Sequence, residues 1–134
     1  MTAISQPNTG SLDLAIPSKS EIDQRIAEVA GLLEKGFPDQ ALIFGFAVLE
    51  AITRVAFGKR FSKEQTPGSV VELLAFEGYV SPSQADKIRA LIKKRNRLVH
   101  GDLEVRATAN DVEAFVQLID EVWQLTLEPT SEPV

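Results

Sequence analysis

The chain has 134 residues, of which 44% are hydrophobic and 25% are charged, and its formal net charge is −5. This length and composition fit one compact domain with an apolar core. The sequence contains no cysteine, which excludes disulfides, thiolate nucleophiles and cysteine metal sites. Histidine and carboxylate residues show no cluster at metal-ligand spacing. We therefore expect neither a metal nor another cofactor.

The ends of the chain and its hydropathy predict a soluble cytoplasmic protein without membrane contact. The first 20 residues are polar, and no stretch approaches the roughly 18–20 uninterrupted apolar residues of a membrane-spanning helix. Residues 1–17 and 128–134 have the composition of disordered tails. One helical domain is expected between them, at residues 18–127.

The first two predicted helices have clear boundary signals. Ser18 followed by Glu21 is a capping-box pattern, and an apolar stripe at helical spacing then continues to Gly36. Pro38 suits the first position of a second helix because its missing amide proton would be unbonded there anyway. Residues 41–57 are apolar nearly all round, which predicts a central helix buried on more than one side.

The rest of the chain also favours helices. A polar, basic loop at 59–68 precedes a short apolar helix at 69–76. The sequence SPSQ at 81–84 combines an N-cap serine, a first-turn proline and a capping-box glutamine, and it predicts a helix over residues 82–100. A last amphipathic helix begins at about residue 110. No segment shows the two-residue alternation of a strand, so the predicted fold is an all-α bundle of four or five helices.

Charge is distributed unevenly along the chain. Residues 54–97 contain ten basic and four acidic side chains, a local charge of +6, whereas the other residues contain four basic and fifteen acidic side chains, or −11. A local basic surface can attract polyanions within a Debye length of about 8–10 Å. A nucleic-acid partner is therefore compatible with the acidic total, but a merely solvated basic face explains the pattern equally well.

Two charged residues interrupt apolar stretches. Arg95 falls within the apolar stripe of the helix predicted at 82–100, and Glu50 lies in the apolar second helix. A guanidinium in a core keeps its proton and needs a carboxylate, carbonyls, a phosphate or solvent. We expect a Glu50–Arg95 ion pair, which could also simply orient two helices.

His100 is the only histidine in the chain and lies four residues after Asn96, so that the two side chains share one helix face. Arg95 points about 140° away from His100 in an ideal helix. Arg95 and His100 could meet if the helix unwinds near Gly101, or if two copies pack across a twofold axis. A lone histidine at a helix C-terminus can instead interact only with the last carbonyls and the helix dipole.

The string RNRLVH at 95–100 resembles the Arg-x4-His motif of HEPN domains, in which the arginine is commonly followed by asparagine. VLEAITR at 48–54 resembles the Glu-bearing second helix of that family. ELLAFEGYVSPSQADKIRALIKKRNRLVHG at 72–101 resembles its motif helix with the preceding helix and turn. The resemblance covers about residues 18–127 and implies a four- or five-helix HEPN-like bundle that commonly forms a homodimer.

The resemblance also implies a metal-independent endoribonuclease with a composite site in the dimer, often a toxin or effector of toxin–antitoxin and antiviral defence systems. Arg95 would bind the scissile phosphate, His100 would move a proton, and Asn96 would position the histidine or the phosphate. Glu50 would be a support residue. The basic side chains expected to bind the RNA backbone are Arg89, Lys93, Lys94 and Arg97.

Other functions stay open at this point. Some HEPN domains are non-catalytic and act as dimerisation, nucleic-acid-binding or nucleotide-binding modules. The helices at 69–76 and 82–100 could also form a DNA-binding helix-turn-helix, although Arg95 would then face inward. Some HEPN toxins carry a modifiable tyrosine two residues after the histidine, where this chain has Asp102. A toxin role would imply an antitoxin or another protein partner, which the sequence does not identify.

Overall fold

The computed structural model describes residues 14–61 and 63–128. Within these ranges the chain forms five α-helices and one short 3-10 helix, with no strand. The elements in chain order are α1 (Lys19–Glu34), α2 (Pro38–Phe57), η2 (Gly58–Phe61), α3 (Pro67–Phe76), α4 (Pro82–Val99) and α5 (Ala109–Leu127). The all-α fold predicted from the sequence is confirmed.

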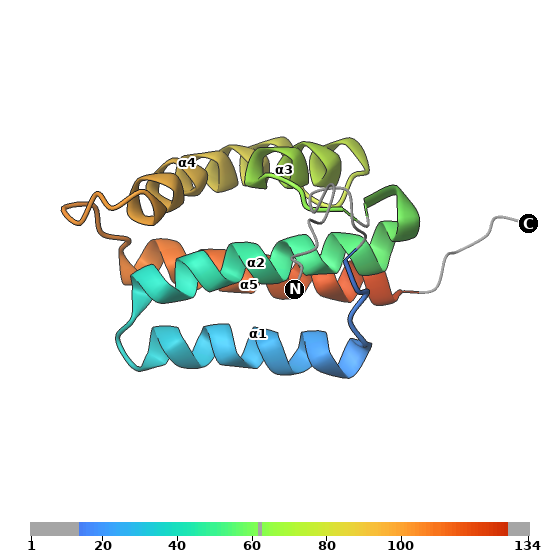
Figure 1. Cartoon of the computed structure of the whole chain (residues 1–134), viewed down its shortest axis with the longest axis horizontal. Helices are drawn as coiled ribbons and strands as arrows, with labels where there is room; N and C mark the ends of the chain where they lie inside the picture. The colour runs from blue at the N-terminus through green and yellow to red at the C-terminus, as the bar shows by residue number, and fades with distance from the viewer. Residues whose placement is uncertain (1–13, 62, 129–134) are drawn as a thin grey trace, which may run out of the picture.

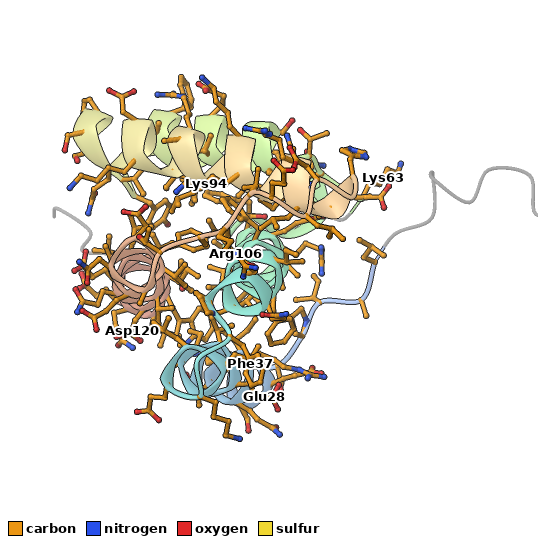
Figure 2. All side chains as sticks on the ribbon, turned by 90° about the vertical axis from the view of Figure 1, so that its left-hand side faces the viewer. Glu28, Phe37, Lys63, Lys94, Arg106 and Asp120 are labelled. Carbon is orange, nitrogen blue, oxygen red and sulfur yellow. The ribbon has the colours of Figure 1, made fainter. Side chains whose placement is uncertain are left out.

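The helices form three layers around α2. Figure 1 shows α1 along one side of α2, α5 behind α2, and the pair α3 and α4 on the opposite side from α1. The end-on view in Figure 2 shows the same layers, with α2 and α5 side by side in the middle. Helix α2 packs against every other helix, while α3 and α4 pack on each other and on α2. The predicted central position of the second helix is therefore confirmed.

The core explains the apolar character of α2. Eight of its residues are buried, and Gly45 lets α5 approach closely, since a Cβ atom there would lie 2.9 Å from the Phe115 ring. Among the described helices, α2 alone is long and apolar enough to cross a membrane by length and composition, with a mean hydropathy of 1.6. Its burial within the bundle accounts for that composition. On the far side of the core, the Trp123 indole of α5 donates to Asp23 Oδ1 of α1 at 2.7 Å.

Local signals set the helix ends. The Ser18 side chain accepts from the Glu21 amide, and both capping-box bonds join Ser81 and Gln84 at the start of α4. The short helix α3 begins two residues before its predicted start at 69. The reason is that Thr66 serves as its N-cap and the following proline occupies the first helical position. The predicted loop at 59–68 is correspondingly shorter and begins in η2.

The expected tails lie largely outside the described residues, at 1–13 and 129–134. Residues 14–17 contain no regular secondary structure and border a pocket formed with α1 and α2. Glu128 is the C-cap of α5. The helices thus occupy the range 18–127 that the sequence assigned to the domain.

Candidate functional site

Helix α4 ends in a glycine-containing turn that carries His100. His100 is the C-cap residue, and Gly101 follows with φ of 89°, a backbone conformation that favours glycine. The Gly101 amide donates to the Leu98 carbonyl at 3.1 Å, and the Asp102 amide donates to the Arg97 carbonyl at 2.9 Å. These bonds satisfy carbonyls of the last turn and end the helix directly after the motif.

Arg95 is half-buried and has no carboxylate partner among the described residues. Its Nη1 donates to Asn96 Oδ1 at 2.9 Å, while its Nε is buried without a hydrogen-bond partner in that part of the chain. A buried donor left without a partner costs about 1–3 kcal/mol. Arg95 therefore retains unused capacity for an anionic ligand.

The expected Glu50–Arg95 ion pair does not form, and this prediction is corrected. Glu50 Oε2 accepts from the Gln65 amide at 2.9 Å and lies 3.5 Å from Arg54 Nη1. Arg54 is one turn further along α2, so it is a nearer partner than any residue of α4. Glu50 thus ties α2 to the segment before α3, and it supports the fold without contacting the motif.

Asn96 connects Arg95 to the region of His100. The sequence predicted that the Arg95 side chain points away from His100, and the structure shows its guanidinium hydrogen-bonded to the neighbouring Asn96 amide group. The Asn96 carbonyl accepts the His100 backbone amide at 3.1 Å. The His100 side chain is exposed and makes no hydrogen bond or ion pair with the described residues. Arg95, Asn96 and His100 therefore place a cation, an amide and an imidazole near the end of α4.

Arg89 is held by two carboxylates and is not a free basic residue. Its Nε and Nη2 donate to Glu72 Oε2 at 3.0 and 2.8 Å, and its Nη1 donates to Asp86 Oδ1 at 2.9 Å. The hydrogen bonds to Glu72, with the charge of both acids, raise the pKa of the Arg89 guanidinium above its ordinary value. Because Glu72 belongs to α3, this cluster joins α3 to α4.

The other three expected RNA-binding residues differ in how free they are. Lys94 Nζ lies 3.5 Å from Asp111 Oδ2 of α5, and Arg97 donates to Asp102 through Nε at 2.9 Å and Nη2 at 2.6 Å. Lys93 is exposed and has no ion-pair partner within the described ranges. Of the four residues expected to bind RNA, three thus have an acidic neighbour, and Lys93 is the one without such a neighbour among the described residues.

Sequence reasoning missed three side chains beside the motif. Asp102 was considered only as the replacement for a tyrosine, whereas it pairs with Arg97. Val99 is 46% exposed and Leu103 is 80% exposed, so two large exposed apolar side chains flank His100 in the sequence. The sequence signal for them was the presence of apolar residues directly before and three positions after the histidine.

The site offers hydrogen-bond donors, a cation and an imidazole. Within residues 14–61 and 63–128, no group of three or more histidine, aspartate or glutamate side chains is arranged to hold a metal ion. Comparison of the chain with protein-family models, with curated proteins and with solved structures finds no match.

Proposed function

We propose that this protein is a HEPN-type endoribonuclease that cleaves RNA by attack of the ribose 2′-hydroxyl, at a composite site formed by two copies of the chain. The observation that carries the proposal is the arrangement at the end of α4. Arg95 donates a hydrogen bond to Asn96. Both residues precede the exposed His100, which lies at the start of the glycine-containing turn. The five-helix bundle is compatible with the HEPN-like fold that the motif resembles.

Arg95 has the properties of a phosphate-binding residue. It makes no ion pair with the described residues, so binding a phosphate would break none. A small outward movement would also expose the buried Nε, which has no hydrogen-bond partner among the described residues. Two parallel N–H groups of a guanidinium match two phosphate oxygens and stabilise the charge that develops during cleavage. The adjacent Asn96 would hold the guanidinium in place.

The chemistry requires a base and an acid. A base removes the proton of the 2′-hydroxyl, the oxygen attacks phosphorus, and the bond to the 5′-oxygen breaks as an acid protonates that oxygen. The products are a 2′,3′-cyclic phosphate and a 5′-hydroxyl. An imidazole suits both roles near neutral pH. Because the chain has one histidine, two copies of His100 would supply the base and the acid.

Exposed apolar side chains support a two-chain site. Val99 and Leu103 flank His100 in the sequence and are exposed. Large exposed apolar groups beside a polar site are typical of protein interfaces. Burying Val99 and Leu103 against a second copy would bring two motif turns together and exclude water from the reacting groups.

The proposed substrate is single-stranded RNA, since only an accessible ribose can adopt the geometry for in-line attack. With Lys93 exposed beside the motif, recognition would depend on the RNA backbone and carry little sequence preference. Such an enzyme would damage cellular RNA in the cytoplasm. We infer a toxin or defence effector, restrained by an antitoxin or another protein partner.

The test is RNA cleavage in the presence of EDTA. We expect wild type to yield 2′,3′-cyclic phosphate ends, and His100→Ala and Arg95→Ala to lose activity by roughly 10²-fold or more while retaining the helical circular dichroism spectrum. Lys87→Ala, on the first half of the same helix, serves as the control and should keep full activity. Full activity in both motif variants refutes the proposal.

A non-catalytic dimerisation or nucleic-acid-binding module is the second candidate. It is favoured by the ion pairs that occupy Arg89 and Arg97 and by the exposed Val99 and Leu103. This function predicts a stable dimer that binds RNA without turnover. Cleavage that disappears specifically in the His100→Ala variant would exclude it.

A further inference from the structure

Asp102 makes a set of contacts that closes the turn around His100. Its amide donates to the Arg97 carbonyl at 2.9 Å, and its Oδ2 accepts from Arg97 Nε at 2.9 Å and lies 2.6 Å from Arg97 Nη2. Its Oδ1 accepts from the Glu104 amide at 3.3 Å. Arg97 and Asp102 are thus joined through the main chain and through their side chains.

These contacts span the histidine. Arg97 precedes His100 by three residues and Asp102 follows it by two, so the main chain is tied together on both sides of the imidazole. Further along, the Ala107 amide donates to Asp39 Oδ1 at 2.6 Å, which anchors the same loop to the first turn of α2. The end of a helix ordinarily frays. Here the Arg97–Asp102 contacts hold the last turn of α4, and the bond to Asp39 holds the loop that follows it.

We propose that Arg97 and Asp102 form a clamp that positions His100, and that Arg97 is a positioning residue, not an RNA contact. The inference rests on the proposed ribonuclease function. Two nitrogens of the Arg97 guanidinium converge on a single oxygen, Asp102 Oδ2, in a charge-assisted contact, while Oδ1 is held by the Glu104 amide. Proton transfer requires the imidazole within about 2.6–3.2 Å of the reacting oxygen. Holding the main chain of His100 therefore contributes to the chemical step, and it contributes little to RNA affinity.

The clamp and an RNA-contact role make opposite predictions for Asp102. If Arg97 bound the RNA backbone, removing the carboxylate would release its positive charge and lower KM. If the pair is a clamp, removing either partner loosens the turn and lowers kcat, with KM nearly unchanged. The two partners should then also act as one unit, so that the double variant is no worse than the single ones.

The experiment compares Asp102→Asn, Arg97→Gln and the double variant under conditions where wild type cleaves RNA. We expect each to reduce kcat by about tenfold to a hundredfold, with no further loss in the double variant. Glu28→Gln is the matched control. It removes an exposed ion pair with Arg25 of 2.8 Å on α1, on the opposite side of the bundle from α4 (Figure 2). A lower KM in Asp102→Asn with unchanged kcat overturns the clamp.

The single histidine provides a second readout that does not depend on cleavage. Its imidazole proton resonances can be assigned without ambiguity. We expect them to shift or broaden in Asp102→Asn and Arg97→Gln, but not in Glu28→Gln. If wild type cleaves RNA, and both clamp variants keep full kcat and unchanged His100 resonances, the clamp alone is overturned. Wild type that does not cleave RNA overturns the ribonuclease function and, with it, the catalytic role of the clamp.

Discussion

Helix α4 carries arginines in both of its halves, and these arginines differ in their side-chain partners. In the first half, Arg89 contacts Glu72 and Asp86, and the helix begins in a complete capping box. In the second half, Arg97 pairs with Asp102, but Arg95 has no acidic partner among the described residues and His100 is exposed. The first half therefore has the character of a structural joint between α3 and α4. In the second half, Arg95 and His100 keep polar groups available for a ligand, while Arg97 is occupied by Asp102.

This difference shows why basic residues cannot be treated as one surface. A phosphate that approaches Arg89 must compete with two carboxylates, whereas a phosphate that approaches Arg95 competes with one neutral amide. Charge-assisted hydrogen bonds are stronger than bonds to neutral groups. A positive charge thus makes a residue a candidate for anion binding. The partners of its side chain decide whether an anion can bind there.

The largest expected effect separates the two arginines directly. Arg95→Ala should reduce kcat/KM for RNA cleavage by roughly 10²- to 10³-fold, because a donor to the developing charge is lost. Arg89→Ala should change kcat/KM by only about threefold, because Glu72 and Asp86 already occupy its guanidinium and leave it little capacity to contact the RNA backbone. Steady-state kinetics with one labelled RNA measures both. If both variants fold and lose kcat/KM equally, Arg95 and Arg89 do not differ in their roles.

Gly101→Ala tests the turn at the end of α4. An alanine at φ of 89° should lower the free energy of unfolding by roughly 1–2 kcal/mol and also reduce cleavage, because the turn carries His100. Gly31→Ala in α1 is the control, since a Cβ there meets no atom within 4 Å. The control should be neutral or stabilising in urea denaturation. A stabilised Gly101→Ala variant would contradict the expected strain.

Ser81→Ala tests the beginning of the same helix. Loss of the N-cap side chain leaves the Gln84 amide without its partner and should cost about 1 kcal/mol of unfolding free energy. The kinetic constants should stay unchanged when measured well below the melting temperature. A specific loss of kcat in this variant would show that the two ends of α4 are coupled.

Glu72→Gln should have the smallest effect. It weakens an exposed ion pair to Arg89, and solvent screening keeps such a pair from contributing much to stability. We expect a slight fall in melting temperature that disappears when measured in high salt. A large fall that persists in salt would mean that the pair contributes more to the α3–α4 contact than its exposure indicates.

Much of the fold could be predicted because its signals are local. The serine, proline and glutamine at the start of α4 act within four residues, as does the glycine that follows His100. The apolar stripes define which helix faces are buried, and the nearly uniform apolar character of α2 indicated its central position. Each of these features depends on neighbours in the chain or on burial alone.

The partners of the charged residues could not be predicted in the same way. Glu50 pairs with Arg54 and with the amide of Gln65, 15 residues further on, and the predicted contact with Arg95 is absent. Arg89 finds its main partner 17 residues earlier, on α3. The acid that an arginine meets depends on how separate helices are placed, as the contact of Arg89 with Glu72 of α3 shows.

The sequence by itself determined the helices, their ends, the central position of α2 and the location of the polar motif at the end of α4. Only the tertiary structure decided which of the basic side chains are neutralised and which remain available. The physical reason is the sequence separation of the interacting residues. Capping and amphipathic burial are set by residues a few positions apart. An ion pair depends on how separate helices pack against one another.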